Sequence, residues 1–327
     1  MPASSVGRRP AVAVHELVKT YASPGRSGFN AVDGVSFEVG EGELFGFLGP
    51  NGAGKTTTLE IVEGIREPTS GRAAVLGLDS VTQREEVKRR IGVQLQAAAY
   101  FDYLTLHEIL ELFGSFYPAR RRPEELLDRV GLLEKRDAQV RHLSGGQARR
   151  FSVVAALVND PEVVFFDEPT TGLDPAARRA VWELIGQINR DEHRTVVLTT
   201  HYMEEAQLLA ERIAIIDHGR IQALDTPQAL IGRFAGSGAI RFTTEARVEL
   251  DELRRIPGVQ GAAEARAAQT GGGAVFGYQV RVGDPDAVLP ELLAFSQRVH
   301  VGLRSVELLP ATLEDVFLAI TGRELRD

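Results

Sequence analysis

The sequence has no cysteine in 327 residues, so disulfides and thiolate chemistry contribute nothing to its fold or activity. It also lacks a long hydrophobic run. No stretch approaches the roughly 18 to 20 apolar residues of a membrane-spanning helix, and the first residues lack the apolar core of a secretory signal. Positive charge is not in excess, and the formal net charge of -8 argues against general nucleic-acid binding. These absences favour a cytosolic protein whose membrane role, if any, comes through a partner.

The remaining composition is that of a soluble globular protein, with 43% hydrophobic and 25% charged residues. A chain of this length suits one large and one small domain. We expect the larger domain over residues 8–230 and the smaller one over residues 237–327.

The clearest motif is GPNGAGKT at residues 49–56, which has the G-x-x-x-x-G-K-[ST] pattern of a phosphate-binding loop. An apolar run at 44–48 predicts a buried strand before it, and residues 55–64 predict a helix after it. The glycines let backbone N–H groups close around phosphate oxygens, and the helix N-terminus adds partial positive charge. Lys55 can reach the β- and γ-phosphates, and the Thr56 hydroxyl suits Mg²⁺.

Polar residues follow two further apolar runs, at 163–166 and 196–198. Asp167 and Glu168 come directly after the first run, at the edge where α/β proteins bind ligands. Asp167 is placed to hold Mg²⁺, directly or through water, and Glu168 is placed to polarise an attacking water. His201 lies just beyond the second run, where it can donate a hydrogen bond to a γ-phosphate.

Two further features could contact an anionic nucleotide. The segment Ser144 to Gln147 (SGGQ) opens a helix predicted over 148–157, where the serine can cap the helix and the glycines expose N–H groups. Tyr21 stands before a Pro/Gly/Ser loop at 23–27. It can stack on a purine face, or it can pack on the sheet as a strand-end aromatic.

The order of elements predicts the fold class. Strands alternating with helices predict an α/β domain with a doubly wound parallel sheet, interrupted by a mostly helical block within residues 104–160. The C-terminal segment has the order β-α-β-β-α-β of a small α+β, ferredoxin-like domain. A last helix begins at Thr312. Its apolar face can pack on its own domain or on a partner subunit, and consists of Leu313, Val316, Phe317 and Ile320.

In this order the motifs resemble those of the ATP-binding subunit of an ABC transporter, over about residues 10–225. The resemblance implies a P-loop NTPase core with a helical subdomain at about 97–160, and ATP and Mg²⁺ as cofactors. It implies that the catalytic residues are Glu168, the switch histidine His201 and the Q-loop glutamine Gln96, with Gln94 close by. The implied metal contacts are Thr56, Gln96 and Asp167. The implied nucleotide contacts are Tyr21, Gly49, Asn51, Gly52, Ala53, Gly54, Lys55, Thr56, Thr57, Ser144, Gly145, Gly146, Gln147 and Asp174 of the D-loop.

Weaker motifs resemble one subgroup, the drug- and antibiotic-export cassettes. They are Ala155, where many import cassettes carry arginine, the segment ARRAVWELI after the D-loop, and residues 312–317 (TLEDVF) in the C-terminal extension. This resemblance implies an ATPase that powers a separate integral-membrane permease, exporting drugs or other small hydrophobic compounds. The subunit would then lie at the cytoplasmic face of the cell membrane, with residues 96–103 as the docking surface.

The chain has one phosphate loop and one signature segment, whereas the family clamps ATP between the loop of one subunit and the signature of another. We therefore expect a homodimer with two equivalent sites, and no nucleic-acid partner. Two alternatives belong to other classes. A soluble ABC ATPase acting on ribosomes or nucleic acid usually carries two cassettes or a long coiled-coil insertion, and neither is present. A non-hydrolysing ATP-gated module is disfavoured by Glu168 and His201.

Overall fold

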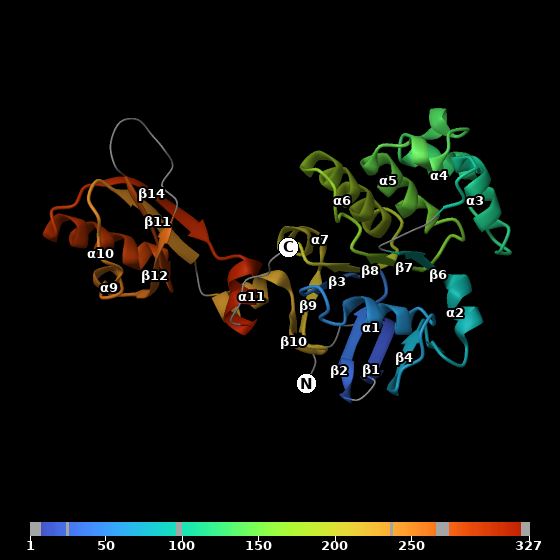
Figure 1. Ribbon diagram of the computed structural model, residues 1–327, viewed down its shortest axis with the longest axis horizontal. Coiled ribbons are helices and arrows are strands. Elements are labelled where there is room, and N and C mark those ends of the chain that lie inside the picture. Colours follow the sequence, from blue (N-terminus) through green and yellow to red (C-terminus); the bar gives the residue numbers. More distant parts are fainter. Residues whose placement is uncertain (1–7, 24–25, 96–99, 236–237, 266–274, 322–327) are drawn as a thin grey trace. The chain divides into compact units, whose positions relative to one another are not determined.

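The computed structural model describes residues 8–23, 26–95, 100–235, 238–265 and 275–321 (Figure 1). The chain divides into two compact units, one reaching to Pro227 and the other starting at Gln228. Residues 228–230, which we expected in the larger domain, therefore belong to the smaller one. In the described ranges, none of the helices combines the length and apolar character needed to span a bilayer.

A six-stranded sheet in the order β10-β9-β3-β8-β7-β6 forms the centre of the N-terminal unit. The strands from β9 to β6 run parallel, and β10 pairs antiparallel at the edge. Every residue of β3, β7 and β8 is buried, as expected for strands covered on both faces. The predicted α/β core is confirmed. Its strands are β3 (Leu44–Leu48), β6 (Ile91–Gln94), β7 (Val163–Asp167), β8 (Thr195–Thr200), β9 (Arg212–Asp217) and β10 (Arg220–Asp225).

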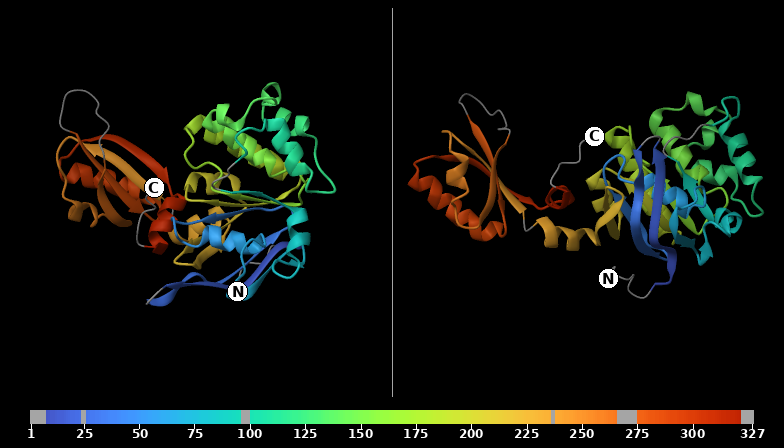
Figure 2. Two further views of the ribbon diagram at one scale, coloured as in Figure 1. Left: turned by 45° about the vertical axis from the view of Figure 1, so that its right-hand side comes forward. Right: turned by 60° about the horizontal axis from the view of Figure 1, so that its bottom comes forward.

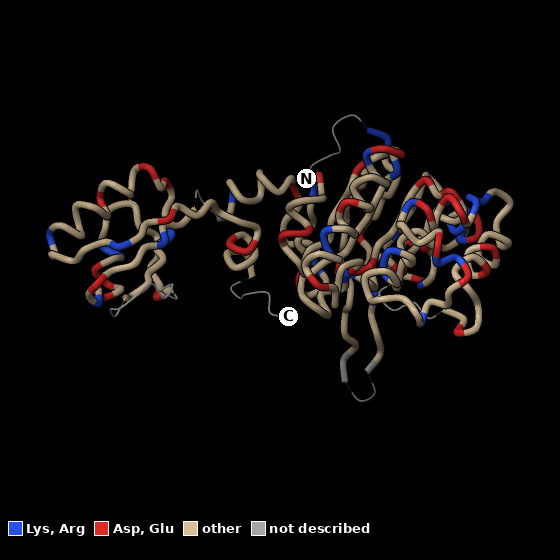
Figure 3. The backbone as a smooth tube through the Cα atoms, turned by 90° about the horizontal axis from the view of Figure 1, so that it is seen from above, with Lys and Arg blue, Asp and Glu red and all other residues tan. Residues whose placement is uncertain are grey.

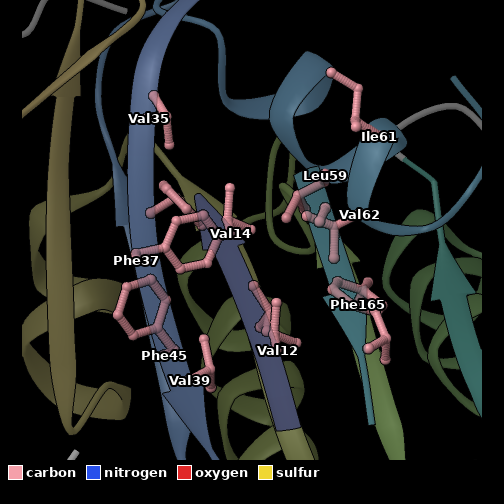
Figure 4. Close-up of a cluster of buried hydrophobic side chains, with 14 of the residues drawn as sticks. Val12, Val14, Val35, Phe37, Val39, Phe45, Leu59, Ile61, Val62 and Phe165 are labelled. Atoms are coloured by element: carbon pink, nitrogen blue, oxygen red, sulfur yellow. The ribbon is translucent and has the colours of Figure 1, made fainter. Parts of the chain in front are cut away.

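The N-terminal strands do not join the parallel sheet. They form a separate antiparallel sheet in the order β2-β1-β4-β5. Aromatic rings connect the two sheets: the Phe37 ring centroid lies 5.5 Å from that of Phe45 (Figure 4). It also lies 4.9 Å from the ring centroid of Phe47. The strands are β1 (Pro10–Ser23), β2 (Arg26–Gly40), β4 (Ser70–Val75) and β5 (Leu78–Asp79).

Helices cover both faces of the parallel sheet. The helical subdomain lies on one side, and α1 with the antiparallel sheet lies on the other (Figures 1 and 2). Helices α3 and α5 each begin with a capping box, made by Thr105 with Glu108 and by Ser144 with Gln147. The helices are α1 (Lys55–Val62), α2 (Arg84–Arg90), α3 (Leu106–Gly114), α4 (Pro123–Arg129), α5 (Gly145–Ala155), α6 (Pro175–Arg190) and α7 (Met203–Leu209), with 3-10 turns at Leu133–Lys135 and Val140–His142.

The C-terminal unit has a four-stranded antiparallel sheet in the order β12-β13-β11-β14. With α9 after β11 and α10 after β13, its elements follow the β-α-β-β-α-β order that the sequence predicted. Buried side chains of both helices, such as Leu253 and Leu292, pack with Ile240 and Tyr278 of the sheet. The elements are α8 (Pro227–Leu230), η3 (Ile231–Ala235), β11 (Gly238–Thr244), α9 (Leu250–Leu253), β12 (Val259–Ala265), β13 (Phe276–Val282), α10 (Pro285–Arg298), β14 (Leu303–Pro310) and α11 (Leu313–Thr321).

The apolar face of α11 is buried within this chain. Leu313, Val316 and Phe317 are at most 1% exposed, and α11 packs against η3 of the same unit. Of the two interpretations of this face, the structure therefore supports packing on the helix's own domain. The buried face is not available to hold a second subunit.

Candidate nucleotide site

The phosphate-loop segment folds tightly between β3 and α1. A Cβ atom on Gly54 would lie 2.3 Å from the Ala31 carbonyl oxygen, and one on Gly49 would lie 2.3 Å from that of Ile216. Gly54 also has a φ of 102°, which side-chain-bearing residues rarely adopt. The loop therefore needs glycine at both positions for its backbone to pass this close to neighbouring strands.

Lys55 lies inside the loop and is only 4% exposed. Its Nζ donates hydrogen bonds to the carbonyl oxygens of Gly49 at 2.7 Å and Pro50 at 3.2 Å. It also forms a buried ion pair with Glu168, at 3.2 Å from Oε1. Burial lowers the pKa of Lys55, and the Glu168 charge opposes this shift. The lysine thus links the loop to the carboxyl end of β7.

Asp167 faces the first turn of α1. Its carboxylate accepts hydrogen bonds from the hydroxyls of Thr199 and, at 3.0 Å, Thr56. Burial raises the pKa of Asp167, while these two hydrogen bonds work to lower it. The two predicted metal contacts, Thr56 and Asp167, therefore lie side by side.

Glu168 is held in an unusual backbone conformation, with a φ of 47°. Its backbone N–H donates to the Thr199 hydroxyl at 3.0 Å, and its Oε2 accepts from the Thr171 hydroxyl at 3.0 Å. His201 Nδ1 lies 3.2 Å from the same Oε2. Burial works to raise the pKa of Glu168, but His201 and Lys55 outweigh it and lower the pKa to about 2. The carboxylate is therefore ionised at neutral pH.

A cavity of about 410 Å³ opens beside these groups. Tyr21 lines it, together with most of the predicted loop contacts and Glu168, while Gly49 is not in the lining. Phe29 on β2 also lines the cavity, although no sequence motif predicted it there. The lining residues are Tyr21, Phe29, Ala31, Pro50, Asn51, Gly52, Ala53, Gly54, Lys55, Thr56, Thr57 and Glu168.

The signature and D-loop residues lie elsewhere on the unit and do not line this cavity. The Ser144 Oγ accepts from the Gln147 N–H at 3.4 Å, so the helix starts at Gly145, three residues earlier than predicted. Gly146 permits close approach of α5 to α6, because a Cβ there would lie 2.9 Å from the Ala177 Cβ. Asp174 caps α6 by accepting from the N–H groups of Ala176 and Ala177. Each segment thus presents a capped helix N-terminus.

Gln96 lies outside the described residues. Gln94 is buried, and its Nε2 donates to the Leu95 carbonyl oxygen at 2.5 Å. It lines a second cavity of about 500 Å³, together with Glu63 and Tyr100. Oε2 of Glu63 and Oε1 of Gln94 are buried there and have no hydrogen-bond partner among the residues that the structure describes. Burial, followed by the charges of Asp167 and Glu60, raises the pKa of Glu63 to about 8.

A buried hydrogen-bond network, which no sequence motif predicted, adjoins the site. Glu205 on α7 is fully buried, and its Oε1 accepts from the Thr170 hydroxyl at 2.9 Å and from Trp182 Nε1 at 2.8 Å. Trp182 is a core residue, as predicted, but it also donates this bond. The network joins α7, which follows His201, to the segment after Glu168 and to α6. The one sequence feature that could have predicted this network is the closeness of Thr170 and Glu205 to the motif residues Glu168 and His201.

The fold and this cavity define a phosphate-loop nucleotide-binding protein. The ABC transporter family model matches residues 32–171. The chain is 38% identical to the Nod factor export ATP-binding protein I of Ralstonia nicotianae, over 100% of this chain and 98% of that protein. It is 37% identical to the daunorubicin/doxorubicin resistance ATP-binding protein DrrA of Streptomyces peucetius, over 97% and 94%. It is 36% identical to the linearmycin resistance ATP-binding protein LnrL of Bacillus subtilis, over 90% and 95%.

Among solved structures, the chain resembles the dimeric post-hydrolysis state of the ATP-binding cassette MJ0796 bound to ADP and Pi. The TM-score is 0.60 at 28% identity, covering 66% of this chain and 98% of that one. The chain belongs to the ABC transporter family, and it is an ATPase. The family predicted from the ordered motifs is confirmed.

Proposed function

We propose that this chain is the ATP-binding and ATP-hydrolysing subunit that powers a separate membrane permease, exporting drugs or other small hydrophobic compounds. The hydrolytic part of the proposal rests on the cluster of Lys55, Glu168 and His201 at the phosphate loop. The relatives that match over most of their length carry names for Nod factor export, daunorubicin/doxorubicin resistance and linearmycin resistance, which supports the export part.

The ion pair between Lys55 and Glu168 suggests how ATP binding prepares the site. A triphosphate in the loop competes for the ammonium group, which then turns from Glu168 toward phosphate oxygens. This frees the ionised carboxylate of Glu168 to orient an attacking water and accept its proton. In this proposal His201 donates a hydrogen bond to the γ-phosphate, and Gln96 is the remaining catalytic residue.

The residues fit Mg²⁺ as the cofactor, because the Thr56 hydroxyl and the Asp167 carboxylate are hard oxygen donors 3.0 Å apart. Mg²⁺ is usually bound through one or two carboxylates together with substrate phosphates, and Asp167 supplies such a carboxylate. Thr56, Asp167 and Gln96 would hold it. When bound, the metal supplies charge neutralisation on the phosphates.

We further propose a homodimer in which each ATP is bound by two chains. Ser144 to Gln147 and Asp174 do not line the cavity of their own chain. Their helix N-termini would complete the site of the second subunit, because two such termini neutralise a triphosphate better than one. The dimeric MJ0796 cassette gives a precedent for the assembly.

A mixing experiment tests this arrangement. Lys55→Ala destroys the loop of one chain, and Ser144→Arg destroys the signature of the other. Heterodimers of the two then hold one intact composite site, so mixing two inactive proteins should restore part of the ATPase activity. Differently tagged chains establish that heterodimers form. Heterodimers that bind ATP but stay inactive would contradict a shared site.

The docking surface for the permease is proposed at residues 96–103. Of its described residues, Phe101 is 59% and Tyr103 is 83% exposed, as suits side chains that a partner would cover. Docking would place the subunit at the cytoplasmic face of the membrane. Acidic and basic residues are interspersed along both units, which favours no nucleic-acid partner (Figure 3).

A further inference from the structure

Phe29 is an exposed aromatic residue at the mouth of the nucleotide cavity. Its side chain is 59% exposed, and it lines the same cavity as Lys55 and Tyr21. Single exposed aromatic residues are common on protein surfaces and usually need no explanation. Its place in the lining of this particular cavity separates Phe29 from such cases.

The pairing of β1 with β2 places Phe29 directly beside Tyr21. The two residues are partners in the antiparallel register, so their side chains project from the same face of the hairpin. Cβ atoms of such partners lie about 4.5–5.5 Å apart. Both side chains line the cavity, so a base bound there can contact the two rings together.

The surroundings of the two rings differ. Lys19 Nζ lies 5.6 Å and Arg66 Cζ 5.5 Å from the centroid of the Tyr21 ring, so cations already contact the tyrosine. Phe29 remains mostly uncovered and offers only an apolar π surface. Such a surface suits a flat, weakly polar group better than a phosphate or a sugar.

We propose that Phe29 is a second base-stacking residue, which with Tyr21 makes the site prefer purine over pyrimidine nucleoside triphosphates. The two fused rings of a purine can overlap both side chains, whereas the single ring of a pyrimidine covers one. This inference rests on the proposed binding of ATP in the cavity, with phosphates at the loop and the base at the hairpin.

Nucleotide affinity of the full-length protein tests the inference, measured by calorimetry with Mg²⁺ and either ATP, CTP or tripolyphosphate. Phe29→Ala should weaken ATP binding about fivefold to tenfold, the size of one lost base–aromatic contact. CTP affinity should fall less, and tripolyphosphate affinity should not change. Phe29→Tyr should restore the wild-type preference for ATP. Phe116→Ala, at a phenylalanine that is 70% exposed in the helical subdomain, is the matched control.

Three results would overturn the inference. If Phe29→Ala binds ATP as tightly as the wild type, Phe29 does not stack on the base. If ATP and CTP lose the same affinity, Phe29 does not confer a purine preference. A matching loss for tripolyphosphate shows that the substitution disturbs the loop. If the wild-type protein does not bind ATP at all, the proposed function fails together with this inference. If the wild-type protein binds ATP and the Phe29→Ala variant binds it equally well, the inference about Phe29 fails and the proposed function stands.

Discussion

The two units of the chain differ in the polar side chains that they bury. The N-terminal unit buries charged side chains, among them Lys55, Glu168 and Glu205. Within the described residues of the C-terminal unit no charged side chain is buried, and the core consists of aliphatic and aromatic side chains beside Thr244. Burying a charge is costly unless it is paired. The difference therefore indicates that the N-terminal unit keeps its buried charges for the reaction rather than for stability.

Hydrogen bonding in the two units shows the same contrast. In the C-terminal core the buried Tyr278 hydroxyl accepts from the Val248 N–H at 2.7 Å. Among the described residues of the N-terminal unit, Glu63 Oε2 is buried without a hydrogen-bond partner. A core selected for stability alone would satisfy such atoms or exclude them. We expect changes in the N-terminal unit to affect turnover strongly, and loss of the C-terminal unit to affect it least.

The largest effect is expected from Glu168→Gln. The substitution keeps the shape of the side chain but removes its capacity to accept a proton, so turnover should fall by at least about a hundredfold. ATP binding should persist, and the ATP-bound dimer should accumulate. Phosphate release and size-exclusion chromatography with ATP measure the two effects. Turnover at the wild-type rate would contradict the role proposed for Glu168.

Lys55→Ala should impair nucleotide binding itself, because the ammonium contacts phosphate before as well as during the reaction. We expect ATP affinity to fall by about a hundredfold, as for other buried charge contacts. Calorimetric titration measures this. Lys88→Ala, at an exposed lysine, is the matched control and should bind normally. An unchanged affinity of Lys55→Ala would count against the phosphate-loop assignment.

A smaller effect is expected at Glu63, where substitution should change how the stability of the fold depends on pH. Its pKa is raised from 4.5 to about 8 in the folded protein. Between these values the folded state keeps a proton that the unfolded chain has released, so stability falls as the pH rises. Glu63→Gln removes this loss. Its advantage over the wild type should therefore grow between about pH 5 and pH 8, by at most about 4 kcal/mol.

Urea unfolding at several pH values measures this advantage. The exposed Glu85→Gln variant is the control and should follow the wild-type profile. Parallel stability profiles of Glu63→Gln and wild type would show that Glu63 ionises normally. Glu168 has the opposite sign: its lowered pKa contributes stability above about pH 4.5 that is lost as the pH falls toward 2.

Removing the C-terminal unit should have the smallest effect on ATP. A chain ending near residue 236 retains the whole phosphate-loop unit and only residues 228–236 of the C-terminal unit, so its ATP affinity should equal that of the full chain. We propose that the C-terminal unit is regulatory or strengthens the dimer, so the truncated chain should dimerise more weakly. Sedimentation with and without nucleotide measures dimer affinity. Equal affinities would leave the unit without this role.

Much of this molecule could be predicted from local patterns. The phosphate loop lies where its motif predicted, and the buried strand ending at Asp167 follows from four consecutive apolar residues. Periodicity located the strands of the C-terminal unit. It could not show that β1, β2, β4 and β5 leave the parallel sheet, because local patterns do not specify which strands pair.

The sequence alone determined which chemistry is available: a glycine-rich loop with Lys55, two acids at the end of a strand, and a histidine after the next one. Only the tertiary structure decided which groups meet. It paired Lys55 with Glu168, set Phe29 beside Tyr21, and joined Glu205 to Thr170 and Trp182. The physical reason is that a motif reports local backbone geometry and residue chemistry, whereas these contacts depend on strand register and on helix packing between distant segments.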